Sequence, residues 1–132
     1  MIYLDSSALM KLIRTETETA ALRDWLATRA DQPMVTSEVG RVEVIRAARR
    51  VGGPAVLEAR AVVDDIDLIV LDRAVQDLAS DIGDPLLRSV DALHLASAIL
   101  LGDDLAAFVA YDHRLTDAAH TAGLAVATPG RA

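Results

Sequence analysis

Four acidic side chains in this sequence could share one pocket. Asp5 and Asp112 each follow a short apolar run. Glu43 lies within a helical stretch, and Asp91 opens a helix. If the fold brings them together, each close pair of carboxylates repels by about 1 kcal/mol in water and about 4 kcal/mol at the effective dielectric of a partly buried site. Such a cluster predicts a bound divalent cation.

Each of these acids also has a simpler explanation. Asp5 and Asp112 precede predicted helices, where Asp is a favoured cap. Asp91 lies in a first helical turn, where a negative charge suits the helix dipole. Glu43 could pair with Arg46, one turn later, for roughly 0.2–0.5 kcal/mol. Read singly, the acids therefore do not establish a site.

Short apolar runs alternate with helical stretches along the chain. Strands are predicted at 2–4, 34–36, 67–71, 107–111 and 124–127, and helices at 7–13, 17–28, 38–51, 55–63, 73–82, 89–101 and 113–121, with Gly102 as a C-cap and Gly123 ending the last helix. This order predicts an α/β fold of three layers, with a mostly parallel central sheet flanked by helices. Ligands bind such sheets beyond the carboxyl ends of the strands, where strand order reverses.

Length and composition limit the class of protein. A chain of 132 residues is expected to form a single domain, residues 1–132, and its 52% hydrophobic but only 3% aromatic composition predicts an aliphatic core. There is no cysteine, so disulfides and thiolate metal sites are excluded. With no leader-like segment and no long apolar run, we expect a cytoplasmic protein without a membrane span.

The net charge of -7 argues against a nonspecific nucleic-acid binder, because that affinity comes from clustered basic residues. It does not exclude a nuclease, since divalent ions can supply positive charge where a phosphate is handled. The candidates for gripping phosphates, which could equally pair with surface acids, are Arg14, Arg41, Arg46, Arg49, Arg50 and Arg114.

Four segments carry the acids in order: 2–9, 38–44, 90–98 and 109–115. They resemble the motifs of PIN-domain nucleases, and within that superfamily the chain looks like a VapC-type toxin of a bacterial type II toxin-antitoxin pair. The resemblance implies that Asp5, Glu43, Asp91 and Asp112 hold Mg²⁺, or Mn²⁺ in its place, for hydrolysis of RNA phosphodiesters by an endoribonuclease. Oxygen ligands suit both ions.

Individual roles and partners follow from the same resemblance. Asp5 and then Asp91 are expected to coordinate directly, Glu43 to orient or deprotonate the attacking water, and Asp112 to act less directly. The implied partners are an RNA substrate, a small cognate antitoxin and a second copy of the chain in a homodimer. The apolar faces of helices 17–28 and 55–63 could dock a partner, or could simply pack in the core.

Three neighbouring polar residues stay open between two roles. Ser7 could contact a phosphate or cap the first helix. His94, one turn after Asp91, could be a ligand or a base, but a buried, hydrogen-bonded histidine is the prediction, because no His pair has zinc spacing. Asp117 is either a rim acid or a solvated one.

Two alternative functions remain. A phospho-acceptor signalling domain would want an Asp pair after the first strand and a Lys after the last, but only Asp5 follows the first strand and the one lysine is Lys11. A PIN fold that only binds a partner is the other alternative, and the intact acidic quartet argues against it.

Overall fold

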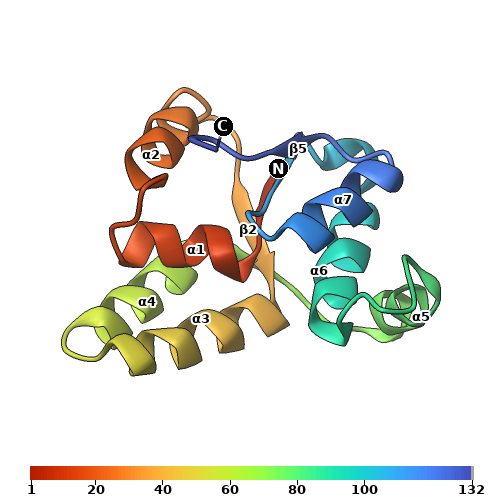
Figure 1. Cartoon of the computed structure of the whole chain (residues 1–132), viewed down its shortest axis with the longest axis horizontal. Helices are drawn as coiled ribbons and strands as arrows, with labels where there is room; N and C mark the ends of the chain where they lie inside the picture. Colours follow the sequence, from red (N-terminus) through yellow and green to blue (C-terminus); the bar gives the residue numbers. More distant parts are fainter. Residues whose placement is uncertain (132) are drawn as a thin grey trace.

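A sheet of parallel strands separates two groups of helices in the computed structural model, which describes residues 1–131 (Figure 1). The strands are β1 (Ile2–Leu4), β2 (Met34–Ser37), β3 (Asp67–Ile69), β4 (Ala107–Val109) and β5 (Val126–Ala127). The helices are α1 (Ser6–Ile13), α2 (Thr19–Ala27), α3 (Glu38–Val51), α4 (Ala55–Asp64), α5 (Arg73–Asp81), α6 (Ser89–Ile99) and α7 (His113–Thr121), with a 3-10 turn, η1 (Gly102–Asp104).

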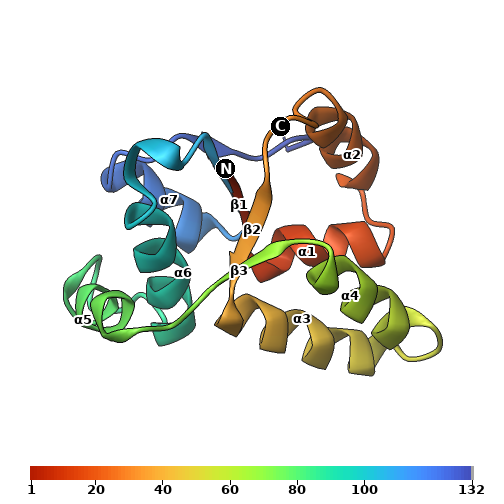
Figure 2. The same cartoon turned by 180° about the vertical axis from the view of Figure 1, so that it is seen from behind.

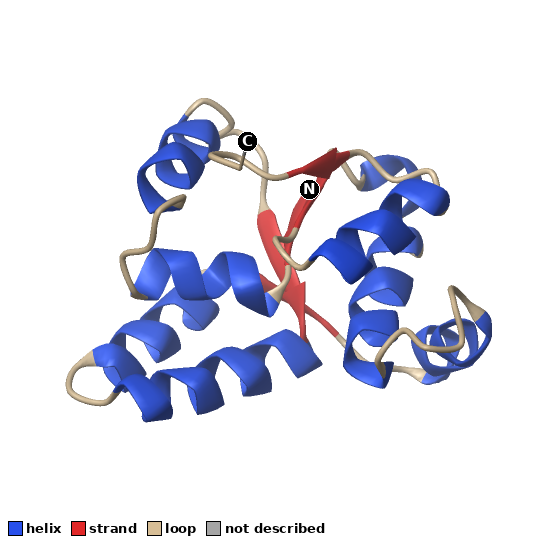
Figure 3. Ribbon diagram, viewed as in Figure 1, coloured by secondary structure: helices blue, strands red, loops and turns tan. Residues whose placement is uncertain are grey.

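The order of the strands across the sheet is β3-β2-β1-β4-β5, and every neighbouring pair is parallel. In the register of the central strands, Leu4 lies opposite Val109 and Tyr3 lies opposite Val35. The predicted three-layer α/β architecture is therefore confirmed (Figure 3). Strand order reverses between β1 and β4, which makes the carboxyl ends of these two strands the expected place for a ligand.

Alternation along β1 divides the core between the two faces of the sheet. Ile2 and Leu4 pack with residues of α1, α3 and α4, whereas Tyr3 packs with residues of α6 and α7. Figure 2 shows the same division from behind, with α1, α3 and α4 on one side of the strands and α5, α6 and α7 on the other. The acids at the carboxyl ends therefore lie where the two helical layers approach each other.

Several predicted element ends are wrong by one or two residues. α1 begins at Ser6, α2 covers only Thr19–Ala27, β2 extends to Ser37, α4 extends to Asp64, α5 ends at Asp81 and β5 begins at Val126. α6 ends at Ile99, and Gly102 opens η1 instead of capping α6.

Two strands end early because side chains take the backbone groups that would extend them. The Tyr111 backbone N–H donates to Ser7 Oγ at 3.0 Å, and β4 stops at Val109. The Leu71 N–H donates to Glu38 Oε1 at 2.8 Å, and β3 stops at Ile69.

Within residues 1–131, no helix combines the length and the apolar character needed to cross a membrane.

Candidate functional site

Asp5 stands at the end of β1 and is the N-cap of α1. Its Oδ1 accepts hydrogen bonds from the Ala8 backbone N–H at 2.9 Å and from the Ser7 hydroxyl at 2.6 Å. The residue is only 3% exposed. Because the cap uses only one of the two carboxylate oxygens, Asp5 can both cap α1 and contribute to a pocket.

Burial raises the pKa of the Asp5 carboxyl above its ordinary value. The nearby Glu43 carboxylate acts in the same direction, whereas His94 and the two hydrogen bonds from Ser7 and Ala8 oppose the rise. The ionised form of Asp5 is therefore under-compensated by the chain itself. A cation beside it would favour ionisation.

Ser7 joins the two strand ends that flank the reversal point. Its hydroxyl donates to Asp5 Oδ1 and accepts from the Tyr111 N–H. It follows that Ser7 ties the end of β1 to the segment after β4. A contact between its hydroxyl and a phosphate stays a prediction.

Glu43 reaches the site from α3 and bonds a histidine of α6. His94 Nε2 lies 2.6 Å from Glu43 Oε1, and His94 Nδ1 lies 2.6 Å from the Tyr3 hydroxyl. His94 is 1% exposed, so the prediction of a buried, hydrogen-bonded histidine is confirmed. Within residues 1–131, the side-chain partner of Glu43 is therefore His94, and the alternative ion pair with Arg46 is not formed.

Asp91 lies in the first turn of α6 and is almost buried. Arg88, the N-cap residue of that helix, donates from Nε to Asp91 Oδ2 at 2.9 Å. The Arg88 side chain is 68% exposed. The hydrogen bond to Asp91 is the main cause that raises the pKa of the Arg88 guanidinium, and the charges of Asp112 and Glu43 add to it. Arg88 therefore lies within electrostatic reach of three of the four acids.

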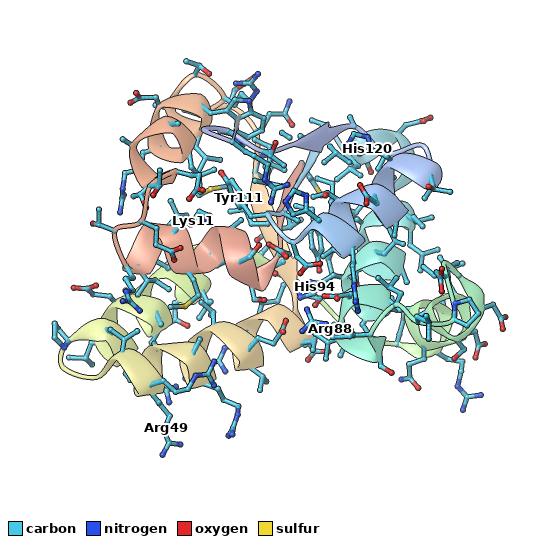
Figure 4. The ribbon with its side chains drawn as sticks, in the orientation of Figure 1. Lys11, Arg49, Arg88, His94, Tyr111 and His120 are labelled. Atoms are coloured by element: carbon cyan, nitrogen blue, oxygen red, sulfur yellow. The ribbon has the colours of Figure 1, made fainter. Side chains whose placement is uncertain are left out.

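Arg88 is absent from the predicted phosphate-binding arginines, although a sequence signal for it existed. Arg88 and Asp91 are three residues apart at a helix start, a spacing that puts them on one face. Figure 4 shows Arg88 and His94 together where the start of α3 faces α6. Arg49 points outward from the far half of α3, away from both.

Asp112 is the N-cap of α7 and accepts from the Leu115 N–H at 3.1 Å. It is half-buried and follows β4, the strand next to β1. All four predicted acids thus lie around the carboxyl edge of β1, β2 and β4.

The donor chemistry of these acids suits Mg²⁺ or Mn²⁺, and the under-compensated carboxyl of Asp5 favours a cation. In the arrangement described for residues 1–131, however, no three His, Asp or Glu side chains converge closely enough to hold an ion together. Glu43 is engaged by His94 and Asp91 by Arg88. The metal assignment of the four acids stays a prediction.

The sequence also offered six arginines and Asp117 as candidates around the acidic residues. In the part of the chain that the structure describes, none of the six candidate arginines forms an ion pair. Arg114 and Asp117 line an apolar groove of about 740 Å³ between α7 and the segment that joins α5 to α6. Asp117 is therefore a groove residue.

Lys11 is buried in α1 and is held by its own neighbours. Its Nζ pairs with Glu18 at 2.8 Å and with Glu16 at 3.2 Å, and it lies 4.5 Å from the centre of the Tyr111 ring. Lys11 is thus paired with Glu16 and Glu18 and lies on α1, whereas a phospho-acceptor domain requires a lysine that follows the last strand. The strand order also differs from the 2-1-3-4-5 order of such domains.

A family model, described as PIN domain, matches residues 2–121. The chain belongs to the PIN-domain family. Curated relatives are similar over nearly their whole length. Ribonuclease VapC47 of Mycobacterium tuberculosis is 45% identical over 133 residues, which cover 98% of each chain, and ribonuclease VapC46 is 45% identical over 128 residues, which cover 97% of each. Within the family, this PIN domain is of the VapC type.

Solved structures agree with this PIN fold. VapC20 of Mycobacterium tuberculosis, described as a toxin that cleaves the sarcin-ricin loop, has a TM-score of 0.76 at 18% identity and covers 98% of this chain and 100% of its own. VapBC2 of Rickettsia felis, bound to promoter DNA, has a TM-score of 0.72 at 13% identity and covers 98% and 99%. At these identities the likeness concerns the fold alone.

Proposed function

We propose that this PIN domain is a divalent-metal-dependent endoribonuclease that acts as the toxin of a type II toxin-antitoxin pair. The observation that carries the proposal is the buried, under-compensated carboxyl of Asp5 at the reversal point of a parallel sheet, with the other three acids on the elements around it. Relatives that are 42–45% identical over almost the full chain are named ribonucleases, which supports the same chemistry.

Asp5, Glu43, Asp91 and Asp112 would hold Mg²⁺ or Mn²⁺. A bound ion of this kind supplies Lewis acidity toward a phosphate and makes an attacking water more acidic. Asp5 is the best direct ligand, because its cap bonds fix Oδ1 and the strand end anchors its backbone. Asp91 would hold the ion with a carboxylate that now accepts a hydrogen bond from Arg88.

The protein side chains prepare the site for an RNA phosphate. Glu43 accepts a hydrogen bond from His94 and would receive a proton from the water that attacks. Arg88 is exposed beside Asp91 and can move its guanidinium onto a phosphate oxygen when that carboxylate binds metal. These two residues would align the water and the phosphate.

We further propose a small cognate antitoxin and a homodimer as partners. Structural neighbours include VapBC2 of Rickettsia felis and a toxin-antitoxin complex from Klebsiella pneumoniae. The net charge of -7 suits a basic antitoxin segment, because opposite charge accelerates association.

The test is cleavage of total cellular RNA by the purified chain, with Mg²⁺, with Mn²⁺ or with chelator. We expect discrete fragments that require metal and that disappear in Asp5→Asn, whose amide oxygen can still cap α1. Asp72→Asn is the matched control, because Asp72 caps α5 through the Val75 N–H at an exposed position. It should cleave like the wild type.

Fragments that persist in chelator would contradict the metal dependence, and fragments that persist in Asp5→Asn would contradict the site. No cleavage with either metal would favour a PIN fold that only binds a partner.

A further inference from the structure

One buried chain of hydrogen bonds links the core of the sheet to the acidic edge. The Tyr3 hydroxyl lies 2.6 Å from His94 Nδ1, and His94 Nε2 lies 2.6 Å from Glu43 Oε1. Its members come from β1, α6 and α3, which belong to the sheet and to both helical layers. Glu43 is the partly exposed end, and Tyr3 is fully buried.

For a neutral His94 ring, the chemistry of the three groups sets the direction of both bonds. An ionised carboxylate only accepts, so the proton on Nε2 is donated to Glu43. Nδ1 is then left to accept the proton of the Tyr3 hydroxyl. Burial raises the pKa of Tyr3, which keeps that hydroxyl protonated. With a single ring proton, on Nε2, both nitrogens of His94 are therefore hydrogen-bonded.

The helix that carries Glu43 makes room for this ring. Gly40 lies one turn before Glu43, in the first turn of α3, where its backbone N–H donates to the N-cap residue Ser37. A Cβ at this position would overlap the Thr36 hydroxyl and lie 3.2 Å from His94 Cε1. The absence of a side chain at Gly40 thus lets His94 lie against α3 and reach the carboxylate.

We infer that His94 is a positioning residue that holds the Glu43 carboxylate toward the acidic edge, with its ring orientation set by Tyr3 and its space provided by Gly40. The inference rests on the proposed function and assigns this histidine a role through Glu43 alone. Partners that hydrogen-bond a ligating carboxylate contribute about 10–100-fold to metal affinity or activity.

The experiment measures Mn²⁺ affinity without RNA, by the electron paramagnetic resonance signal of free Mn²⁺. We expect His94→Leu, which has no donor, to weaken Mn²⁺ binding by about 10–100-fold. His94→Gln can place an amide N–H near the position of Nε2, and it should recover most of the loss. Tyr3→Phe removes only the hydroxyl and should weaken binding by a smaller factor.

A double-mutant cycle separates positioning from general damage. Since His94 acts through Glu43, adding His94→Leu to Glu43→Gln should weaken Mn²⁺ binding little beyond Glu43→Gln alone. Full additivity of the two losses would overturn the inference. Wild-type affinity in His94→Leu would also overturn it, while leaving the proposed function intact if Glu43→Gln binds weakly.

Thermal unfolding in chelator checks that each variant is folded. If His94→Leu shows no unfolding transition, His94→Gln and Tyr3→Phe decide the question. In that case two results together overturn the inference. Tyr3→Phe binds Mn²⁺ as tightly as the wild type, and the loss of affinity from His94→Gln adds fully to the loss from Glu43→Gln in the double variant. Wild-type affinity in Glu43→Gln overturns both this inference and the place of Glu43 in the proposed site.

Discussion

Asp5 has two roles that make opposite demands on its charge. As the N-cap of α1 it benefits from a negative carboxylate, but its burial disfavours that same charge. A capping residue on the surface does not face this conflict. The buried position of Asp5 therefore makes the stability of the metal-free protein depend on whether this carboxyl is ionised.

In chelator we expect Asp5→Asn to be more stable than the wild type at neutral pH. The folded-state pKa of Asp5 is raised, so its contribution to stability is fully present below the unfolded value of about 3.9 and is lost as pH rises through the folded pKa. The advantage of the variant should therefore grow as pH rises from about 4 and level off only above the folded-state pKa of Asp5.

Urea unfolding across this pH range measures the difference, with Asp72→Asn as the exposed-cap control that should change little. A variant less stable than the wild type at neutral pH would show that the cap bonds outweigh the cost of burial.

Arg88 is predicted to contribute to RNA affinity more than to folding. Its pair with Asp91 involves a side chain that is 68% exposed, so Arg88→Gln should cost no more than about 1 kcal/mol of stability. Loss of one phosphate contact should make the slope of log K against log[salt] shallower by about 0.7 for single-stranded RNA.

Binding is best measured in an Asp5→Asn background, which prevents cleavage. Arg49→Gln is the matched control, because Arg49 points away from the site (Figure 4). Equal slopes for the two arginine variants would remove Arg88 from the RNA interface.

The sequence motifs select the four acids as candidates, but they do not reveal what the acids contact. Glu43 and His94 are 51 positions apart, and only the packing of α3 against α6 brings them to 2.6 Å. Helical spacing made Arg46 the nearest candidate partner of Glu43. A buried imidazole with both nitrogens bonded prevailed, because it satisfies more polar groups at once.

At the scale of elements, hydrophobic periodicity was sufficient for the order of helices and strands. The ends of the elements depend on single hydrogen bonds between a side chain and a distant backbone group, such as Ser7 with Tyr111 and Glu38 with Leu71. These bonds join residues that are 104 and 33 positions apart. Local patterns carry no information about them.

Gly40→Ala tests whether the close approach to α3 matters. Helix propensity alone predicts a gain of no more than about 1 kcal/mol in the first turn of α3, but overlap with the Thr36 hydroxyl and crowding of His94 should give a net loss of about 1–3 kcal/mol. Chemical unfolding in chelator measures the sum.

Thr36→Ala combined with Gly40→Ala is the control for that loss. The Thr36 hydroxyl is a buried oxygen without a hydrogen-bond partner within the described residues, so its removal sacrifices no bond. The double variant should recover much of the lost stability. A stabilising Gly40→Ala would mean that α3 can shift away from His94 at little cost.

At the scale of the whole molecule, metal binding and folding should be coupled. A ligand that binds only the folded state stabilises it by RT ln(1 + [L]/Kd), about 2.7 kcal/mol at a hundredfold excess over Kd. We expect Mg²⁺ or Mn²⁺ to raise the melting temperature of the wild type by several degrees and to have much less effect on Asp5→Asn.

Calorimetry with each metal, and with a monovalent salt at equal ionic strength, measures this coupling. An equal rise in the wild type and in Asp5→Asn would indicate general charge screening of a chain that carries a net charge of -7.

Burial of Lys11 affects how the protein can be labelled. The chain has a single lysine, and its amine is enclosed by two glutamates and an aromatic ring. Reagents directed at lysine side chains should therefore react slowly with the folded protein and readily once α1 and the segment before α2 separate. The rate of acylation of Lys11 should therefore report local opening at the C-terminal end of α1.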